Sequence, residues 1–438
     1  MNGDRLMNEQ EGPKVRRVEV TPVAFADPPL LNKLGVHEPY AIRTIVEVVA
    51  EDGIIGLGET YGDAAHLTMV QRLAERVIGM DIFATTRLWE VSSGLLRGTS
   101  RQDQHGLTGK ATPIGTVDRV TSAFEVAFLD AQGRALGRSV SDLLGGSVRS
   151  EVPYSAYLFY KWAGHPDAEP DRFGAALDPD GIVAQARWLV EEYGFTAIKL
   201  KGGVFGIDEE VEAIEALHDA FPDHPLRLDP NAAWSVQESI DVGRRTDGLL
   251  EYLEDPTAGI PGMAQVAREV PMPLATNMCV VSFDQLPQAI DERPVGVILS
   301  DHHVWGGLQR SRLLAGICDT FGIGLSMHSN SHLGISLAAM TQLASVTPNL
   351  TYACDTHWPW KDSRDDVVEP GAFSFHGGSL AVPTGPGLGV DLDRDALARL
   401  HEQYQRCGIR TRDDGGYLSS LAADFEPESR SRMLINRP

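Results

Sequence analysis

The sequence predicts an α/β fold, in which a barrel of alternating strands and helices follows an N-terminal α+β domain. Three observations support this fold. Beyond Val152, strand-like runs recur every ~25 to 30 residues with helical stretches between them, which is the rhythm of a parallel sheet. Almost every run ends in a polar or ionisable residue, as barrel strands with catalytic groups do. Before Val152, the pattern is that of an antiparallel meander followed by helices.

Residues 1–150 are expected to form the α+β domain, with its first ~13 residues disordered. Strands are predicted at 16–26 and 43–51, and the turn signal Glu51-Asp-Gly53 leads into a third strand at 54–59. Apolar residues at three- and four-residue spacing predict helices between 64 and 144. The polar, glycine-rich stretch 98–113 lacks periodicity, so it is predicted to be a mobile loop.

Residues 151–385 are expected to form the barrel, and residues 386–438 to pack back on it and on the first domain. The clearest helices lie at 180–193, 209–221 and 308–321. A doubly wound open sheet would also fit this alternation, but the Gly-rich fingerprint of a nucleotide fold is absent after the first strand. In the last segment, a helix is predicted at 394–407. The predicted strands end near Tyr157, Lys201, Asp229, Asp255, Asn277, Asp301, Ser329 and Asp355.

Composition excludes several classes of function. The net charge of −23 opposes binding to nucleic acids and anionic membranes, which need basic patches. No apolar run is long enough to span a bilayer, and residues 1–12 lack the apolar core of a secretory signal. The four cysteines are scattered without metal-binding spacing, which indicates reduced thiols in a cytoplasmic protein. We therefore expect a cytoplasmic protein that acts on a small molecule. We also expect a homo-oligomer, although the composition itself does not determine the oligomeric state.

Two lysines in the stretch 196–204 are the most informative residues. Lys199 and Lys201 are two positions apart in a predicted strand, so they share a face. Two neighbouring ammonium groups lower each other's pKa, and a lysine with a lowered pKa can act as a base near neutrality. The alternative is an exposed edge strand that carries two solvated lysines.

Three oxygen-bearing side chains end successive strands and predict a metal site. Asp229, Glu254 and Asn277 lie on neighbouring strands ~4.8 Å apart, so their oxygens can converge on one cation. Oxygen ligands without sulfur or imidazole favour Mg²⁺, with Mn²⁺ as the alternative. Asp255 competes with Glu254, because adjacent residues face opposite sides of a strand. Taken singly, each residue also suits a strand-end turn or a helix cap.

An aspartate and a histidine end the next two strands. Asp301 and His328 can pair, with the carboxylate setting the imidazole tautomer. His302, His303 and His332 compete for this role. With the lysine pair on the opposite side of a metal, the arrangement suits removal of a proton next to a carboxylate, because a divalent cation and an ammonium group stabilise the enediolate.

These strand ends resemble the motifs of the enolase superfamily, and within it those of the glucarate dehydratases. The resemblance runs through the barrel in order and implies an α+β capping domain over a modified (β/α)7β TIM-type barrel. It also implies Mg²⁺ and dehydration of a dicarboxylic acid sugar such as D-glucarate to 5-keto-4-deoxy-D-glucarate. The motifs are Lys199-Leu-Lys-Gly-Gly-Val204, Leu228-Asp-Pro-Asn231, Glu254-Asp-Pro256, Ala275-Thr-Asn-Met278, Met327-His-Ser-Asn330 with His332, Asp355-Thr-His-Trp358, Leu34-Gly-Val-His-Glu-Pro39 and Arg412-Asp-Asp414.

The resemblance also implies roles for single residues. Lys201 would be one base, with Lys199 lowering its pKa and touching the substrate carboxylate. His328, oriented by Asp301, would act on the opposite face and return a proton as general acid. Further substrate contacts are implied for His37, Tyr157, Asn231, Asn330, His357 and Arg412, with Arg412 on the far carboxylate.

Two departures and several alternatives stay open. Ala232 stands where many relatives have glycine, and the loop 100–109 matches known members poorly, which bears on the substrate. Alternatives within the superfamily are a dehydratase of another aldarate or aldonate and an epimerase-like enzyme. A Schiff-base aldolase would also use a strand lysine, and borohydride would trap only that enzyme. A non-catalytic acid-sugar-binding relative is the alternative from another class.

Overall fold

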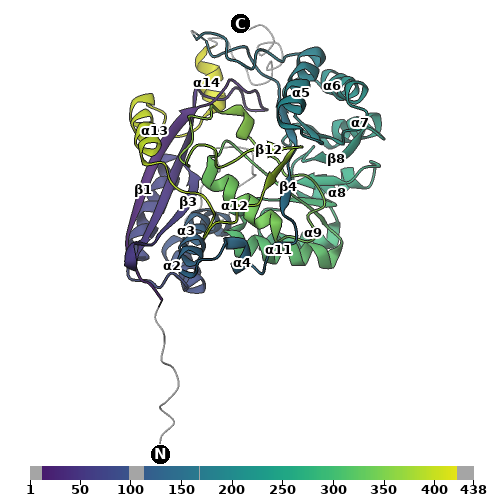
Figure 1. Cartoon of the computed structure of the whole chain (residues 1–438). Helices are drawn as coiled ribbons and strands as arrows, with labels where there is room; N and C mark the ends of the chain where they lie inside the picture. The colour runs from purple at the N-terminus through teal and green to yellow at the C-terminus, as the bar shows by residue number, and fades with distance from the viewer. Residues whose placement is uncertain (1–11, 98–112, 167, 422–438) are drawn as a thin grey trace, which may run out of the picture.

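The computed structural model describes residues 12–97, 113–166 and 168–421 of the chain. A sheet-and-helix cap at the N-terminal end of the chain stands beside a barrel, and both contribute to one continuous core (Figure 1). The disorder expected for residues 1–11 and the loop expected at 98–112 lie outside the described residues.

The cap is built on an antiparallel sheet, which confirms the predicted meander. β1 (Val15–Ala26), β2 (Tyr40–Ala50) and β3 (Ile55–Tyr61) lie in that order, and a one-turn helix, η1 (Glu51–Gly53), joins the last two. Helices α1 (Ala64–Arg76), α2 (Thr85–Leu96), α3 (Pro113–Leu136) and α4 (Val140–Leu143) follow. The long helix α3 lies so close to β3 that a Cβ atom at Gly58 would overlap the backbone carbonyl of Ala123.

The barrel contains seven parallel strands in the order of the sequence, which confirms the predicted fold class. Each strand ends within two residues of its predicted end, and β6 and β7 end at the predicted residues, so most of the polar residues stand at or just beyond the strand ends. The strands are β5 (Ala156–Phe159), β6 (Ile198–Lys201), β7 (Leu226–Asp229), β8 (Leu250–Glu254), β9 (Leu274–Thr276), β10 (Val297–Ser300) and β11 (Gly324–Met327).

Helices alternate with these strands and cover the outside of the barrel (Figure 1). The three helices predicted most clearly are present as α5, α6 and α11. The helices are α5 (Pro179–Tyr193), α6 (Ile207–Ala220), α7 (Val236–Arg245), α8 (Gly259–Ala267), η2 (Phe283–Gln285), α9 (Leu286–Glu292), α10 (His302–Trp305), α11 (Leu308–Phe321), α12 (Gly334–Ser345) and η3 (Trp358–Trp360).

The prediction of an eighth strand that ends near Asp355 is wrong, because this segment does not form a regular strand. The segment 350–355 makes only single bridges, one to Leu325 of β11 and one at Cys354 to Tyr154. It still closes the ring, because the backbone N–H of Asp355 donates to Met327 and the carbonyl of Cys354 accepts from Ser155. The segment is too short and irregular for a regular ladder, yet its polar end residue reaches the same rim as the other strand ends.

The last part of the chain returns to both halves. β4 (Glu151–Pro153), β12 (Phe375–His376) and β13 (Ser379–Ala381) form a small antiparallel sheet. The predicted helix is confirmed as α13 (Arg394–Cys407), which lies against β1 (Figure 1). A further helix, α14 (Asp414–Leu421), was not predicted, because its sequence is short and rich in glycine and serine.

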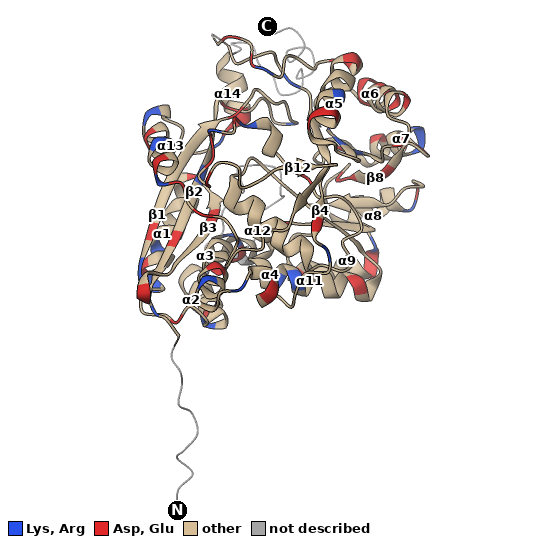
Figure 2. Ribbon diagram, viewed as in Figure 1, with Lys and Arg blue, Asp and Glu red and all other residues tan. Residues whose placement is uncertain are grey.

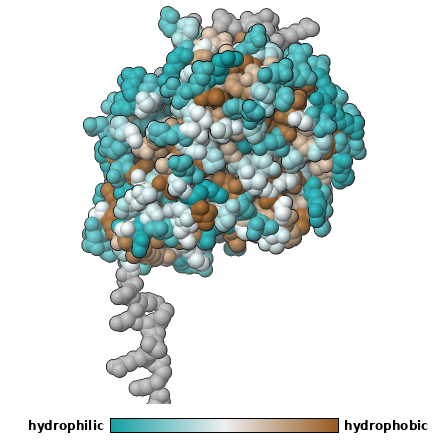
Figure 3. All heavy atoms as spheres, turned by 45° about the vertical axis from the view of Figure 1, so that its right-hand side comes forward, coloured by the Kyte–Doolittle hydropathy of each residue, from teal (hydrophilic) through white to brown (hydrophobic). Residues whose placement is uncertain are grey.

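The charge of the surface and the state of the cysteines agree with what the composition predicts. No helix among the described residues is long and apolar enough to cross a membrane. Acidic side chains are spread over the outer helices of both halves (Figure 2), and hydrophobic residues on the face drawn in Figure 3 form separate patches. All four cysteines are free, which confirms the predicted reduced thiols.

Candidate functional site

The lysine pair lies on an interior strand of the barrel. β6 is hydrogen-bonded to β5 on one side and to β7 on the other, and both lysine side chains are almost completely buried. The alternative of an exposed edge strand is therefore wrong. Both ammonium groups lie over the ring of Tyr157, at 4.6 Å for Lys199 and 5.8 Å for Lys201. This ring ties the two charges to one side of the barrel interior.

Lys199 is enclosed by carboxylates. Its Nζ lies 2.6 Å from Glu254 Oε2, 2.7 Å from Asp355 Oδ2 and 3.3 Å from Asp229 Oδ2. Burial disfavours the ammonium, but the charges of Asp355 and Glu254 outweigh burial and raise the pKa of Lys199 well above its usual value. The expectation that repulsion between the lysines lowers the pKa is thus wrong for Lys199, because strand residues alone do not reveal which acids surround them.

Lys201 has a different environment from Lys199. Its Nζ donates to Asp229 Oδ2 at 2.7 Å and to Asn231 Oδ1 at 2.8 Å. These two acceptors come from the end of β7 and hold the amine at the open rim of the barrel. An amine held in this way can remove a proton from a molecule bound above the strand ends.

The three predicted metal ligands lie together at this rim. Asp229 and Glu254 are the last residues of β7 and β8, and Asn277 follows β9 directly. All three are buried. Burial and the negative charge of Asp229 raise the pKa of Glu254 well above its usual value.

The polar atoms of this cluster are incompletely satisfied by the protein. Oε1 of Glu254 and both polar atoms of the Asn277 amide are buried and have no hydrogen-bond partner among the described residues. Buried polar atoms without partners are costly, and carboxylate and amide oxygens are the ligands that a hard divalent cation prefers. The donor set fits Mg²⁺ and contains neither sulfur nor imidazole.

Asp255, the competitor of Glu254, points away from this cluster. Its carboxylate accepts from the hydroxyl of Thr276 at 2.6 Å and from the backbone N–H of Asn277 at 2.7 Å. The backbone reaches this position with a φ of 37°, an uncommon conformation for an aspartate. Burial raises the pKa of Asp255 to about 7. Asp255 therefore supports Asn277 from behind, while Glu254 faces the interior.

Ala232 adopts a left-handed conformation next to this site. Its φ is 56°, which costs an L-residue about 1 to 2 kcal/mol, whereas glycine loses only about 0.4 to 1 kcal/mol more entropy on folding. We expect Ala232→Gly to raise the melting temperature slightly and Ala232→Val to lower it clearly. Thermal unfolding of the three proteins tests this order. A valine variant as stable as the parent would contradict the strain.

Asp301 and His328 are brought together as predicted. Asp301 Oδ2 lies 3.2 Å from Nδ1 of His328, and both residues are buried. Asp301 also caps α10, because its Oδ1 accepts from the backbone N–H of His303 at 2.9 Å. Burial opposes ionisation, but His303 and His328 hold the pKa of Asp301 well below its usual value. The cap interpretation and the partner interpretation of Asp301 therefore both apply.

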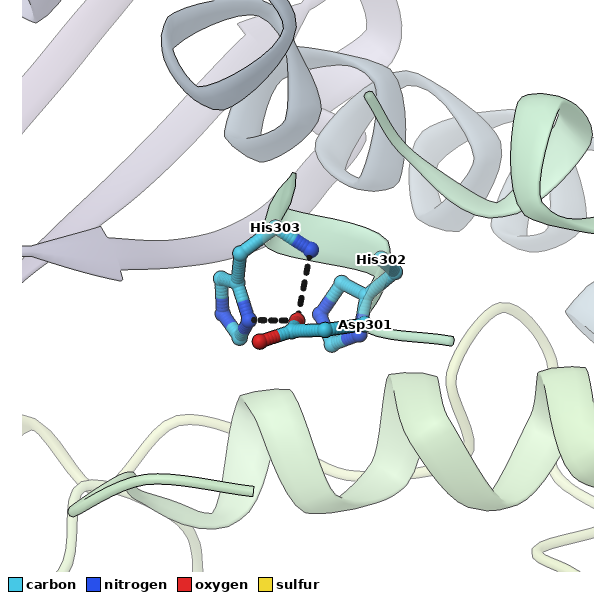
Figure 4. Close-up of side chains that lie close together, drawn as sticks. All are labelled: Asp301, His302 and His303. Atoms are coloured by element: carbon cyan, nitrogen blue, oxygen red, sulfur yellow. Dashed lines mark hydrogen bonds and ion pairs between the residues drawn. The ribbon is translucent and has the colours of Figure 1, made fainter. Parts of the chain in front are cut away.

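Asp301, His302 and His303 lie close enough to hold a metal ion (Figure 4). Both ring nitrogens of His303 already have partners, Asp301 Oδ1 at 2.8 Å and Arg43 Nη2 at 3.0 Å. A guanidinium donates and cannot share its acceptor with a cation. This cluster is thus less suited to a metal than the oxygen cluster at β7 to β9.

The predicted substrate contacts surround the same rim. The ring of His357 lies 4.9 Å from that of Tyr157, and its Nδ1 is 3.2 Å from the hydroxyl of Ser329. Burial lowers the pKa of His357 well below its usual value, and the nearby charges of His328 and Lys201 act in the same direction. His357 therefore stands within electrostatic reach of both His328 and Lys201.

The cap and the C-terminal segment supply the other predicted contacts. His37 Nδ1 is 3.0 Å from Asp27 Oδ2. Arg412 donates to both oxygens of Asp414, through Nε at 2.9 Å and Nη2 at 2.8 Å. Its Nη1 has no hydrogen-bond partner among the described residues, so one edge of the guanidinium can still bind an anion. Asn330 donates to the hydroxyl of Tyr61 at 3.2 Å.

Two charged cap residues at this rim were not predicted. Arg43 of β2 and Glu59 of β3 form a buried ion pair with an Nε to Oε1 distance of 2.8 Å. Arg43 Nη1 also reaches Asn330 Oδ1 at 3.3 Å. The available signal was an arginine inside a mainly apolar strand, since such a residue is buried only when it is paired.

The arrangement has two side chains that can accept or donate a proton, on different sides of one rim. Lys201 lies beside the oxygen cluster on β6, and His328 follows β11, beyond β5 and the closing segment. Between them lie the oxygens of Glu254 and Asn277, which can bind a cation. Such a site can remove a proton next to a carboxylate and deliver another proton from the other side.

Two family profiles match the chain. The profile of the mandelate racemase and muconate lactonizing enzyme N-terminal domain matches residues 36–145. The enolase C-terminal domain-like profile matches residues 181–396. Together they span the cap and most of the barrel.

Among named relatives, a probable glucarate dehydratase from Streptomyces coelicolor is 51% identical over 413 residues, which cover 92% of this chain and 95% of that protein. A D-xylonate dehydratase from Haloferax volcanii and an arabinonate dehydratase from Saccharolobus solfataricus are each 25% identical. The match to the xylonate dehydratase covers 84% of that protein and 81% of this chain. The match to the arabinonate dehydratase covers 93% of that protein and 86% of this chain.

Solved structures of the same architecture contain ligands. A protein described as an enolase from Thermobispora bispora, complexed with magnesium and formate, is 65% identical with a TM-score of 0.93, over 95% of this chain and 99% of that one. Another from Pseudomonas fluorescens, with bound magnesium, potassium and tartrate, is 46% identical with a TM-score of 0.91, over 95% and 98% of the two chains.

Proposed function

Because the chain belongs to the enolase superfamily and is an acid-sugar dehydratase, we propose that its substrate is D-glucarate and that its metal is Mg²⁺. The observation that carries the proposal is the position of Lys201 and His328 on two sides of a buried cluster in which oxygens of Glu254 and Asn277 have no hydrogen-bond partner among the described residues. The relative named as a probable glucarate dehydratase supports the choice of substrate, and the magnesium in two similar structures supports the metal.

Asp229, Glu254 and Asn277 would hold the cation. Bound there, Mg²⁺ would stabilise the negative charge that develops on the substrate carboxylate when its neighbouring carbon loses a proton. The ammonium of Lys199, buried beside Glu254, holds that ligand in place and adds positive charge on the same side. We propose that Lys199 also anchors the acidic ligands, in addition to the role beside Lys201 that the resemblance implies.

Lys201 and His328 would divide the proton transfers. Lys201 Nζ takes the proton from the carbon next to the carboxylate, and the electron pair of that C–H bond forms a double bond to the β-carbon. The β-hydroxyl leaves with a proton from His328, as water. The resulting enol takes a proton at carbon and becomes the keto acid, so atoms and charges balance.

A dicarboxylic substrate suits the charges at the far end of the site. Arg412 keeps Nη1 for an anion, and His37 lies in the same buried group with Asp414. A second carboxylate would bind there, whereas a monocarboxylic aldonate would leave the Nη1 edge of Arg412 without an anionic partner. Two bases also permit epimerisation next to the carboxylate, so an epimer is an expected side product.

A panel of acid sugars tests the proposal. Purified protein with Mg²⁺ is mixed with D-glucarate, its epimer at the reacting carbon, other six-carbon diacids and aldonates, and keto-acid formation is followed by ¹H NMR. We expect D-glucarate to give 5-keto-4-deoxy-D-glucarate with a kcat/KM about 10-fold or more above that of any aldonate. No turnover of any six-carbon diacid would refute the substrate. Substituting Mn²⁺ for Mg²⁺ tests metal preference, and sedimentation tests the expected homo-oligomer.

A further inference from the structure

Arg43 connects the cap to the acid-base pair of the barrel. It stands on β2, its side chain is buried, and its Nε donates to Glu59 Oε1 at 2.8 Å. On the other side of the guanidinium, Nη2 lies 3.0 Å from Nε2 of His303. The cap thus places a permanent hydrogen-bond donor against a histidine of the barrel.

This contact determines where the proton of His303 resides. A guanidinium can only donate, so Nε2 of His303 must accept and carries no hydrogen. The neutral ring then has its hydrogen on Nδ1, which lies 2.8 Å from Asp301 Oδ1 (Figure 4). The hydroxyl of Ser336, 2.9 Å from Nε2, can donate as well and does not oppose this tautomer.

The tautomer in turn leaves one oxygen of Asp301 for His328. Oδ1 accepts from the backbone N–H and from Nδ1 of His303, and Oδ2 faces Nδ1 of His328 at 3.2 Å. Because an ionised carboxylate only accepts, His328 also carries its hydrogen on Nδ1. Its Nε2 is therefore the nitrogen that can exchange a proton with a substrate.

We propose that Arg43 and His303 are positioning residues for His328. Arg43 donates to His303, His303 donates to Asp301, and His328 donates to the other oxygen of Asp301. These hydrogen bonds set the tautomer and ring orientation of His328. The inference rests on the proposed role of His328 as the proton-transfer group of one substrate face. It assigns to the cap a part in the chemistry in addition to its part in covering the barrel.

Glu59 fixes the position of the Arg43 guanidinium relative to the barrel. Besides accepting from Arg43, its carboxylate accepts from the backbone N–H groups of Leu333 at 2.9 Å and Ser336 at 2.8 Å, at the beginning of α12. The same ion pair therefore binds the cap to the helix that follows His328. A shift of the cap would move Arg43 away from His303 and from Asn330 together.

Replacements of His303 test the proposal without leaving Glu59 unpaired. His303→Leu removes both hydrogen bonds. His303→Asn retains an N–H donor near the position of Nδ1, and an amide needs no partner to set its tautomer. Ser336→Ala is the matched control, because it removes the hydroxyl contact to Nε2 and keeps the guanidinium. Deuterium exchange is measured on D-glucarate and on its epimer at the reacting carbon, of which His328 serves one and Lys201 the other.

The expected result is a selective loss. In His303→Leu, exchange of the epimer served by His328 falls about 100-fold or more, and exchange of the other changes less than about threefold. His303→Asn stays within about 10-fold of the parent, and Ser336→Ala leaves the ratio unchanged. An equal fall for both epimers in His303→Leu, or a worse result for asparagine than for leucine, would overturn the proposal.

A second measurement is independent of the substrate. Long-range ¹H–¹⁵N NMR of the histidines in the full protein, assigned through the His303 variants, reports which nitrogen carries hydrogen. We expect hydrogen on Nδ1 of both His303 and His328, and loss of the latter signature in His303→Leu. Hydrogen on Nε2 of His303 would refute the proposal. If the parent protein exchanges neither epimer, the proposed function fails, and the NMR result still decides on the positioning residues.

Discussion

Replacing Lys201 with alanine is expected to abolish proton exchange on one face of the substrate and to leave the other face active. The amine is the proposed proton-transfer group on the β6 side, where Asp229 and Asn231 hold it in place, and Lys199, the other amine of β6, is enclosed by acids. Exchange of one epimer of glucarate should fall about 10³-fold or more, and dehydration from that epimer should fall with it. Deuterium incorporation followed by ¹H NMR measures both epimers.

His328→Asn is the matched control for this variant. It should give the opposite pattern, with exchange lost on the epimer that Lys201→Ala retains. Lys201→Arg keeps a positive charge but is a far weaker base, so it should resemble alanine. If Lys201→Ala retained full exchange on both epimers, the assignment of this base would be wrong.

Removal of the metal is the second change that is expected to have a very large effect on activity. Treatment with EDTA should lower the turnover of D-glucarate by about 10⁴-fold or more, and added Mg²⁺ should restore it, since the cation supplies several kcal/mol of charge stabilisation. Glu254→Gln should require about 100-fold more Mg²⁺ for half-maximal turnover, because it removes the charge of a carboxylate that lies 2.6 Å from Lys199 and would hold the cation. A titration with Mg²⁺ at fixed substrate measures this shift.

Glu269→Gln is the control for the glutamate substitution. Glu269 is exposed and pairs with Arg244 at the surface, so the same change of charge should leave the Mg²⁺ titration unmoved. Full turnover after chelation would contradict the metal-dependent mechanism. It would leave the positions of Lys201 and His328 to be explained by another reaction.

Local patterns were sufficient for the scaffold and for the residues at the strand ends. Hydrophobic periodicity separated strands from helices, as in α5 and α6, because each period reflects the geometry of a single element. Asp229 and Glu254 were found for the same reason, since parallel strands of a barrel bring their carboxyl ends to one rim. The segment before Asp355 was overestimated as a strand, because its pairing depends on two neighbours that a local pattern does not contain.

Charges and contacts between distant segments could not be read in this way. The sequence placed Lys199 beside Lys201 and implied repulsion, but the fold adds Glu254 and Asp355, which reverse the direction of the pKa shift of Lys199. The sequence indicated His303 only as a competitor of His328. In the structure, the contact with Arg43 makes His303 a link between cap and barrel.

The chain by itself therefore determines the order of strands and points to the proposed oxygen ligands and the proposed pair of proton-transfer groups, because these follow from repeats and from residues at the ends of single elements. Only the tertiary structure decides which acids surround each lysine, which nitrogen of a histidine carries hydrogen and which cap residues reach the rim. Those properties depend on distances of a few ångströms between segments separated by tens to hundreds of residues. Electrostatic and hydrogen-bond energies change over that range of distance, while sequence patterns do not record it.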